Sequence, residues 1–435
     1  MRLFGTSGIR RVADKSLFRL ALEVGLVAGG VYGQVVVGRD TRTSSEAVKS
    51  ALVAGLLAAG AEVADAGVVP TPTLALAARE FDAGAMVTAS HNPPEYNGIK
   101  LLNPDGSAFA PDQQAQIEGM MAGGSLAAAR WDRIKGVSPY RRAVARHIER
   151  IRKDFPGRFE LKVVLDCGGG AASVITPNLL EALGVSVIAL NCHPTGLFPR
   201  PSEPVESSLG ELMRQTRESG ADLGIAHDGD ADRMMAVDDR GRFIPGDKLL
   251  ALLARAVGAG EVVTTIDASM LIDEMGFRVT RTRVGDNYVS GALKRGGDFG
   301  GEPSGSWVFP GVSLCPDGIY AAAQLLAIAA RQKLSVLVDG LPAYPLLRGS
   351  ISSDGVVVSE MESGLAAMKP LSVSHTDGLR LEFADGWLLV RASGTEPRIR
   401  VTAEARSQAR ARQLYDGGVG VVRACMPEGR KGELD

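Results

Sequence analysis

The sequence predicts an α/β protein built from three related α/β domains and a smaller C-terminal α+β domain. A strand–helix–strand pattern occurs three times along the chain, and each copy opens on an apolar strand that ends at an aspartate. The residues after 345 break this pattern with short alternating strands. The length of 435 residues fits three or four domains at roughly 150 residues each.

The three copies begin and end on the same residue types. Their first strands, VVVGRD, KVVLD and EVVTTID, end at Asp40, Asp166 and Asp267. The helical segments that follow stop at Gly60, Gly184 and Gly276. Glycine tolerates the left-handed conformation that commonly ends a helix, and strand, helix and strand in this order indicate a parallel sheet. Three copies therefore predict three related domains, with one large α/β sheet as the alternative.

The C-terminal part of the chain has a different pattern. The segments DGLRLEF, GWLLVRAS and RIRVTAEA are short alternating strands joined by Asp-Gly or Gly-rich turns, and a helical segment follows them. This pattern predicts a small antiparallel α+β domain. Candidate linkers lie near residues 136–139, 241–247 and 341–345. We therefore expect domains at residues 1–138, 139–241, 242–345 and 346–435.

The composition is typical of a soluble globular protein, with 45% hydrophobic and 23% charged residues. The net charge of −2 offers no broad basic field for nucleic acid or an acidic membrane. The N-terminus has no apolar signal segment, and the longest small-apolar run, residues 51–61, is too short to span a bilayer. The four cysteines lie far apart without a C-x-x-C pair, which suits reduced thiols. We expect a cytoplasmic protein, monomeric or homodimeric, whose partner is a small molecule.

The stretch GAMVTASHNP presents Ser90 at the end of an apolar strand, just before a rigid turn. A nucleophilic serine must be exposed and positioned, and ligands of open α/β sheets bind at the carboxyl ends of the strands. The chain lacks G-x-S-x-G, and His91 is too close in sequence for the geometry of a triad base. Acyl transfer is therefore disfavoured, and phosphoryl transfer beside a cation is favoured. A capping or turn serine is the alternative.

The segment GIAHDGDADRMMAVDD indicates a metal site. Asp228, Asp230 and Asp232 alternate after a short apolar strand, and three such carboxylates repel one another unless a cation binds them. Oxygen-only ligands suit Mg²⁺. An EF-hand loop would need glycine and glutamate where this chain has Arg233 and Asp239, so it fits poorly. A solvated acidic turn is the remaining alternative.

Three further segments suit sugar and phosphate groups. Glu302 and Ser304 in GGEPSGSW can bond vicinal sugar hydroxyls, although a plain turn is equally compatible. The VRASGTEPRIRV loop offers backbone N–H groups, two hydroxyls and an arginine to a phosphate, through Arg391, Ser393, Gly394 and Thr395. The opening FGTSGIRR and the later GRDTR bring to the first sheet edge Ser7, Arg10 and Arg39.

Six motifs, GTSGIR, TASHNP, NGIK, DGDADR, GEPSG and RASGTEPRIRV, occur in this order over essentially the whole chain. Together they resemble the α-D-phosphohexomutase family. The resemblance implies three α/β domains with mixed sheets and an α+β domain around a central cleft. It also implies one Mg²⁺ per subunit and a hexose 1,6-bisphosphate as activator.

The resemblance assigns roles to individual residues. It makes Ser90 the phosphorylated residue and gives the catalytic work to Ser90, Lys100, Arg10 and His91. The metal ligands would be an oxygen of phosphorylated Ser90 with Asp228, Asp230 and Asp232. The substrate would be held by Arg233, Glu302, Ser304, Arg391, Ser393, Gly394 and Thr395. Two departures stand out: Ser306 replaces a histidine common in the family, which leaves the general base open, and Arg11 replaces a common glycine.

The implied reaction moves a phosphoryl group from Ser90 to a hexose monophosphate, and the bisphosphate intermediate turns and returns its other phosphate. The segment TRTRVGDNYV and the GEPSG loop with Trp307 look most like archaeal phosphoglucosamine mutases, which often carry arginine where Asn287 stands. We therefore expect interconversion of glucosamine 6-phosphate and glucosamine 1-phosphate. Phosphomannomutase or phosphoglucomutase activity is the alternative. A haloacid-dehalogenase-like phosphatase with Asp228 as nucleophile, or a non-catalytic sugar-phosphate binding protein, would represent other classes.

Overall fold

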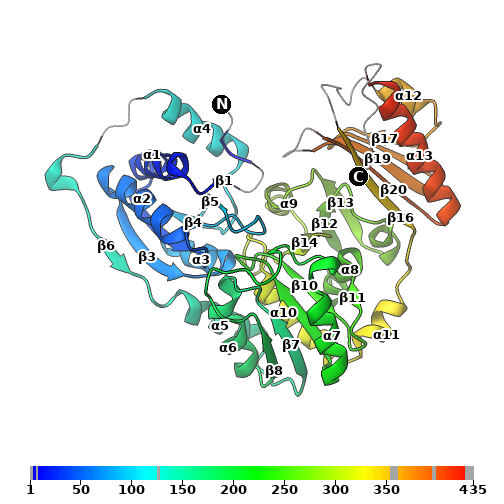
Figure 1. Ribbon diagram of the computed structural model, residues 1–435, viewed down its shortest axis with the longest axis horizontal. Helices are drawn as coiled ribbons and strands as arrows, with labels where there is room; N and C mark the ends of the chain where they lie inside the picture. The colour runs from blue at the N-terminus through cyan, green and yellow to red at the C-terminus, as the bar shows by residue number, and fades with distance from the viewer. Residues whose placement is uncertain (1–2, 6–7, 125–127, 353–360, 394–397, 427–435) are drawn as a thin grey trace.

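Four β-sheets follow one another along the chain, from the blue N-terminal end to the red C-terminal end of Figure 1. This computed structural model describes residues 3–5, 8–124, 128–352, 361–393 and 398–426. Three of the sheets mix parallel and antiparallel strands, whereas the last is antiparallel throughout. The predicted fold class is therefore confirmed, while the boundaries between the domains stay predictions.

The first sheet has six strands in the order β1-β5-β4-β2-β3-β6. Strand β5 is antiparallel to its neighbours β1 and β4, and the other pairs are parallel. The strands are β1 (Ile9–Val12), β2 (Gln34–Arg39), β3 (Glu62–Val68), β4 (Ala83–Val87), β5 (Tyr96–Leu102) and β6 (Val137–Pro139). The helices are α1 (Lys15–Val31), α2 (Ser45–Ala58), α3 (Thr71–Ala77) and α4 (Pro111–Ala122).

Strands β2 and β4 form the centre of this sheet and are apolar on both faces. Val35 and Val37 join one hydrophobic cluster, while Val36 between them joins another on the opposite face. Successive side chains of a strand point to opposite faces, so a strand covered by helices on both sides reads as a continuous apolar run. This is why β2 contains the continuous apolar run VVV.

The second sheet has the order β11-β10-β9-β7-β8 and the third the order β13-β12-β14-β15. The second contains β7 (Lys162–Asp166), β8 (Ser186–Leu190), β9 (Leu223–His227), β10 (Met234–Val237) and β11 (Phe243–Ile244), with α5 (Ala143–Asp154), α6 (Thr176–Ala182) and α7 (Gly210–Ser219). The third contains β12 (Glu261–Thr265), β13 (Arg278–Thr282), β14 (Phe299–Glu302) and β15 (Ser306–Val308), with α8 (Gly246–Ala256), α9 (Asp286–Leu293), α10 (Gly318–Ala329) and α11 (Leu334–Asp339).

The three mixed sheets repeat one four-strand arrangement. Three parallel strands are followed by a fourth that returns antiparallel beside the third, in the orders β3-β2-β4-β5, β8-β7-β9-β10 and β13-β12-β14-β15. The predicted helix-ending glycines have φ angles of +92°, +82° and +82° at Gly60, Gly184 and Gly276. In the third copy a 3-10 helix, Met270–Met275, replaces the expected α-helix. The helix is short because β12 ends at Thr265 and residues 266–269 form the turn, so only six residues remain before Gly276.

The last sheet, in the order β16-β20-β19-β18-β17, packs on helix α13. Its elements are β16 (Leu346–Ser352), α12 (Glu362–Ala366), β17 (Ser372–Ser374), β18 (Leu379–Phe383), β19 (Gly386–Ala392), β20 (Arg398–Ala405) and α13 (Gln408–Ala424). It has its own hydrophobic core. This is the small α+β unit that the alternating C-terminal segments predict.

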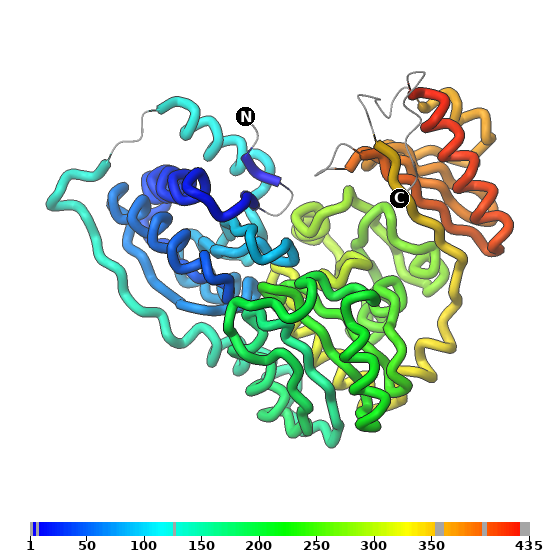
Figure 2. The backbone as a smooth tube through the Cα atoms, in the orientation of Figure 1, coloured from blue at the N-terminus to red at the C-terminus, as the bar shows by residue number. Residues whose placement is uncertain are grey.

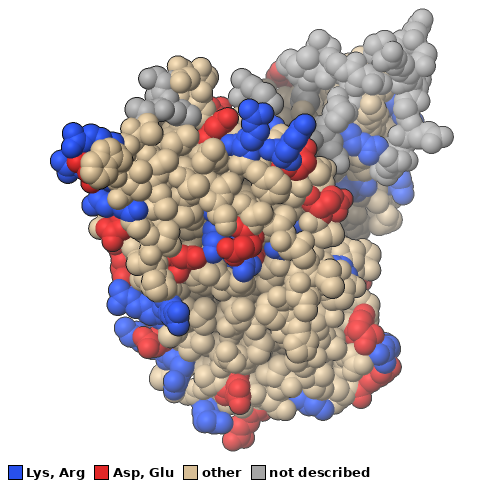
Figure 3. All heavy atoms as spheres, turned by 60° about the vertical axis from the view of Figure 1, so that its left-hand side comes forward, with Lys and Arg blue, Asp and Glu red and all other residues tan. Residues whose placement is uncertain are grey.

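The second and third α/β units share one continuous hydrophobic core that extends from Ile151 to Leu341. The first unit and the last unit have cores of their own and lie on either side of the green and yellow middle of Figure 2. On the face drawn in Figure 3, positive and negative side chains are interspersed. In the part of the chain that the structure describes, none of the helices combines the length and apolar character needed to cross a membrane.

Candidate active site

The three chemistry-bearing loops occupy the same position in the three repeated sheets. Each one connects the third strand to the antiparallel fourth strand, so each lies at the carboxyl end of the parallel strands. The loops span residues 88–95, 228–233 and 303–305. Each contains a residue with positive φ, namely Ser90 at +51°, Ala231 at +57° and Gly305 at +100°. Repetition of one fold therefore brings three different loops to equivalent sheet edges.

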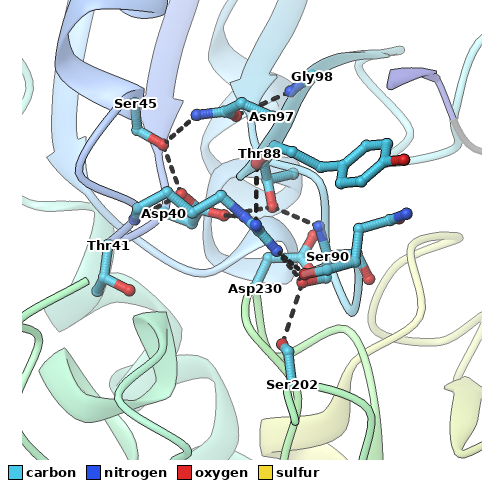
Figure 4. Close-up of polar contacts among 12 residues, drawn as sticks. Asp40, Thr41, Ser45, Thr88, Ser90, Asn97, Gly98, Ser202 and Asp230 are labelled. Carbon is cyan, nitrogen blue, oxygen red and sulfur yellow. Dashed lines mark hydrogen bonds and ion pairs between the residues drawn. The ribbon is translucent and has the colours of Figure 1, made fainter. Parts of the chain in front are cut away.

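Ser90 lies in a tightly bonded loop and is 1% exposed. Its Oγ donates to Oδ2 of Asp228 across 2.7 Å, from the first unit to the second. A left-handed conformation costs a non-glycine residue about 1–2 kcal/mol. Hydrogen bonds offset this cost: the Ser90 amide donates to Thr88 Oγ1 at 2.9 Å, and its carbonyl accepts from Ser202 Oγ at 3.2 Å. Figure 4 shows Thr88 and Ser202 approaching Ser90 from the two sides.

Gly229, the glycine of the DGDADR motif, allows the second unit to approach this loop. A Cβ at Gly229 would lie 2.6 Å from the carbonyl oxygen of Ser90, which is closer than such atoms can pack. Thr71 closes the same junction, because its amide donates to the carbonyl of Asp230 at 2.9 Å and its hydroxyl to the Asp230 carboxylate. Any larger residue at position 229 would therefore separate Ser90 from Asp228.

The three aspartates of the DGDADR motif converge as the sequence predicts. Carboxylate oxygens of Asp228, Asp230 and Asp232 lie within 4.8 Å of one another, and all three residues are buried. Lys100 joins them, because its Nζ lies 2.7 Å from Asp230 Oδ2 and 2.6 Å from Asp232 Oδ2. The other oxygens of Asp230 and Asp232 are buried and have no hydrogen-bond partner among the described residues. Buried carboxylate oxygens normally have partners, so these two fit cation ligands.

The charges of this cluster are unevenly balanced. Burial, followed by the charges of Asp232 and Asp230, raises the pKa of Asp228 well above its usual range. Burial also raises the pKa of Asp232. Burial opposes ionisation of Asp230 as well, but the Lys100 ammonium outweighs it and lowers the pKa of Asp230. Lys100 and Arg233 together thus leave Asp228 and Asp232 with raised pKa values, and a divalent cation would supply the missing positive charge.

His91, Arg10 and Arg233, which the sequence predicts near Ser90, lie around the Ser90 loop. His91 Nδ1 lies 3.4 Å from Ser90 Oγ, and burial together with Arg233 and Arg10 lowers the pKa of His91 to about 2. Its imidazole is therefore neutral. Arg10 donates to Asn92 Oδ1 at 3.0 Å. The backbone amide of Arg233 donates to Asp228 Oδ1 at 3.2 Å, and its guanidinium contacts Glu203 at 3.1 Å.

A separate cavity of about 610 Å³ lies between the last three units. Predicted residues in its wall are Glu302, Ser304 and Arg391. Glu302 accepts from the Gly285 amide at 2.6 Å, and burial raises the pKa of Glu302 to about 7. The Ser90 cluster is not part of this wall among the described residues, but the Arg233–Glu203 ion pair connects the two regions because Glu203 lines the cavity.

The structure adds residues that sequence reasoning missed. Arg348, Arg400, Asp247 and Asp267 also line the cavity. Arg400 belongs to the RASGTEPRIRV motif, and Asp267 is the last residue of the predicted strand EVVTTID. The sequence therefore contains a signal that could have identified both residues. Arg348 had none, because it stands in β16 beyond any motif.

Several residues predicted for the site do not line the cavity or lie outside the described residues. Gly394, Thr395 and Ser7 lie outside the described residues. Ser393 donates its amide to the carbonyl of Arg398 at 2.7 Å. Arg39 pairs with Glu46 on the first unit. Ser306, the residue that replaces a common histidine, begins β15 and bridges to Arg233, so it ties the second loop to the third.

Comparisons with known proteins agree with this architecture. The sequence models of the phosphoglucomutase/phosphomannomutase family match α/β/α domain I at residues 1–127, domain II at 138–241, domain III at 245–344 and the C-terminal domain at 355–423.

Curated relatives match over nearly the whole chain. A probable phosphoglucosamine mutase of Methanocella arvoryzae is 46% identical over 98% of this chain and 99% of that protein. Another, of Methanosarcina barkeri, is 49% identical over 93% of this chain and 96% of that protein.

Solved structures match as well. A phosphoglucomutase/phosphomannomutase family protein of Burkholderia thailandensis aligns with a TM-score of 0.88 at 28% identity, covering 100% of this chain and 99% of that one. A putative phosphomannomutase of Thermus thermophilus aligns with a TM-score of 0.79 at 29% identity, over 96% and 98% of the two chains. Together with the domain matches, these relatives show that the chain belongs to the phosphoglucomutase/phosphomannomutase family of α-D-phosphohexomutases.

Proposed function

We propose that this protein is a phosphoglucosamine mutase, which interconverts glucosamine 6-phosphate and glucosamine 1-phosphate through phosphorylated Ser90. The observation that carries the proposal is the contact of Ser90 Oγ with Asp228 at 2.7 Å, beside Asp230, Asp232 and Lys100. A hydroxyl at the end of a rigid strand, next to clustered acids and a lysine, suits phosphoryl transfer. The names of the archaeal relatives support glucosamine as the sugar.

The chain's own groups have distinct parts in such a transfer. The bond from phosphorus to Ser90 Oγ breaks as the oxygen of the free sugar hydroxyl bonds to phosphorus, which requires the two oxygens to be in line. The sugar hydroxyl gives up its proton in this step, and Ser90 Oγ takes up a proton as it leaves. In the dephosphorylated enzyme the Asp228 carboxylate accepts a hydrogen bond from the Ser90 hydroxyl. Neutral His91 is a poor base at its lowered pKa and serves as a hydrogen-bond partner. Arg10 and Arg233 supply positive charge for the phosphoryl oxygens.

The three aspartates and the phosphoserine would hold one Mg²⁺. Their oxygen-only donor set and the two unpartnered buried oxygens of Asp230 and Asp232 fit this ion. When bound, this ion would supply positive charge that offsets the negative charge of the transferring phosphoryl group. A hexose 1,6-bisphosphate would phosphorylate Ser90 and prime the cycle.

The cavity suits the rest of the substrate. Arg348, Arg391 and Arg400 form a cationic wall from the last sheet for the phosphate that is not reacting. Glu302 and Ser304 line the same cavity and would bond ring hydroxyls. Asp267 follows β12, which pairs with the strand that ends at Glu302, so both carboxylates lie at one sheet edge. A carboxylate there can accept a charge-assisted hydrogen bond from the C2 ammonium group of glucosamine.

Phosphomannomutase or phosphoglucomutase activity is the alternative, supported by the name of the Thermus thermophilus structure.

The deciding experiment compares kcat/KM for the 6-phosphates of glucosamine, mannose and glucose, with bisphosphate primer and Mg²⁺. We expect glucosamine 6-phosphate to be preferred. Intact mass should show one phosphate on Ser90, and Ser90→Ala should lose both this phosphate and turnover. Retained turnover in Ser90→Ala with a phosphate on Asp228 would indicate a phosphatase instead.

A further inference from the structure

Arg42 is a fully buried arginine that grips the loop carrying Ser90. It lies two residues after Asp40, the aspartate that comes immediately after β2, and both side chains are completely shielded from solvent. Its Nε contacts Asp40 Oδ2 at 3.1 Å. Its remaining nitrogens donate to four backbone carbonyls, of Pro93 at 2.6 Å, Tyr96 at 2.9 Å, Ser90 at 2.8 Å and Asn92 at 2.7 Å. The mechanism proposed above assigns no role to Arg42 or Asp40.

These bonds fix both limbs of the loop. The carbonyls that Arg42 binds begin at Ser90 itself and end at Tyr96, the first residue of β5. Asp40 holds the loop on the amide side of Ser90. Thr88 Oγ1 donates to Asp40 Oδ2 at 2.7 Å, and the same Thr88 oxygen accepts a hydrogen bond from the Ser90 amide. Figure 4 shows Asp40, Thr88 and Ser90 in this chain of contacts. The left-handed conformation of Ser90 is therefore held from its amide and from its carbonyl.

The same arginine faces the second unit, which supplies the aspartates. Its guanidinium lies over the ring of Phe198, 5.0 Å from the centroid. Thr41 beside it donates to the carbonyl of Gly169 at 2.9 Å, and Ser202 donates to the Ser90 carbonyl that Arg42 also binds. Arg42 thus lies where the Ser90 loop meets the unit that carries Asp228.

The second unit contains a similar pair. Asp166 is the last residue of β7 and Asp40 comes immediately after β2, and Arg200 Nε donates to Asp166 Oδ2 at 2.8 Å. Arg200 also donates to the carbonyl of His227 at 2.8 Å, directly before Asp228. In two repeats, therefore, an aspartate at the end of the first parallel strand or just after it pairs with an arginine that also donates to backbone carbonyls, in the Ser90 loop for Arg42 and at the last residue before the aspartate loop for Arg200.

We propose that Arg42, oriented by Asp40, is a positioning residue that sets the direction of Ser90 Oγ toward Asp228 and the transferring phosphoryl group. Arg42 acts through the loop backbone and touches no substrate atom. A planar guanidinium can serve four carbonyls and a carboxylate at once, whereas a lysine ammonium has only three donors. The inference rests on the proposed phosphoserine mechanism, because only an in-line transfer makes the orientation of Ser90 matter.

The test compares Arg42→Met and Arg42→Lys with wild type, and with Arg214→Met as a control at an exposed position of α7. Arg214 forms ion pairs with Glu211 and Glu218 and is 46% exposed. We measure kcat and KM for glucosamine 6-phosphate well below the melting temperature, and the rate at which bisphosphate phosphorylates Ser90. Displacement of a reacting atom by about 1 Å costs about 100-fold in rate.

We expect kcat and the Ser90 phosphorylation rate to fall by about 10- to 100-fold in Arg42→Met. The fall should be smaller in Arg42→Lys, and KM should stay within about threefold because Arg42 does not line the substrate cavity. A folded Arg42→Met protein with wild-type kcat and only a lower melting temperature would overturn the inference. If Arg42→Met does not fold, an unchanged kcat in Arg42→Lys overturns it equally. Wild-type protein that is never phosphorylated on Ser90 would refute the proposed function, and the inference with it.

Discussion

Replacement of Lys100 by methionine tests how the acidic cluster is balanced. Lys100 pairs with Asp230 at 2.7 Å and with Asp232 at 2.6 Å, and these side chains are at most 6% exposed. Removing one partner of a buried ion pair costs about 3–5 kcal/mol, because the remaining charge has no compensation. Methionine keeps the length and apolar character of the lysine stem, so the substitution removes little beyond the ammonium group.

The pairs join the first unit to the second, so the loss should appear as local opening. Hydrogen–deuterium exchange of peptides spanning residues 96–102 and 223–234 should become faster by about 100-fold to a few thousand-fold, since each 1.36 kcal/mol is a factor of ten. Saturating Mg²⁺ at 100 times its Kd should restore about 2.7 kcal/mol of this protection.

A control pair sets the scale for this experiment. Lys49→Met removes the pairs of Lys49 with Asp65 and Glu46, whose carboxylates are 26% and 56% exposed, and should cost no more than about 1 kcal/mol. Exchange in Lys100→Met that rises less than tenfold, or that Mg²⁺ does not slow, would refute the view that lysine and metal ion balance the same carboxylates.

Three further predictions concern the metal, the pH and the sugar. Asp230→Asn should raise the Mg²⁺ concentration needed for half-maximal rate by about tenfold or more, because one charged ligand is lost, and an unchanged Mg²⁺ titration would contradict the ligand assignment. Burial raises the pKa of Glu302 to about 7, so the folded protein holds this proton more tightly than the unfolded chain. The resulting stabilisation, about 3 kcal/mol, is fully present below about pH 4.5 and is lost as the pH rises through about 7. Melting temperatures of wild type should therefore fall relative to Glu302→Gln over this range, and parallel curves would refute the raised pKa. Asp267→Asn should lower kcat/KM for glucosamine 6-phosphate by about 10- to 100-fold and that for glucose 6-phosphate much less. An equal fall for both sugars would show that Asp267 does not read the amine.

Local sequence patterns were sufficient where a residue's role depends on its neighbours in the chain. Strands such as VVVG and KVVL, the helix-ending Gly60 and the alternating C-terminal segments predicted the units correctly, because burial on a strand and the left-handed turn of glycine are local properties. The grouping of Asp228, Asp230 and Asp232 was predictable for the same reason, since five residues of one loop place them together.

Long-range contacts were not predictable in this way. The sequence gives no sign that the second and third units share one core, because each strand pattern is complete in itself and says nothing of which surfaces meet. Asp40 and Asp166 were read only as strand ends, and their partners Arg42 and Arg200 became visible when the loops that they hold were placed in space. The wall of the cavity between the last three units likewise includes Arg348, which no motif contains.

By itself, then, the sequence determined the number and type of the repeated units, the hydroxyl at Ser90 and the acidic loop, since short-range sterics and charge repulsion act within a few residues. The tertiary structure alone decided that Ser90 Oγ reaches Asp228, 138 residues further along the chain. That contact depends on Gly229 admitting the Ser90 carbonyl and on Arg42 holding the loop. Such distances are set by the packing of whole units against one another, and packing is a property of surfaces that no single segment contains.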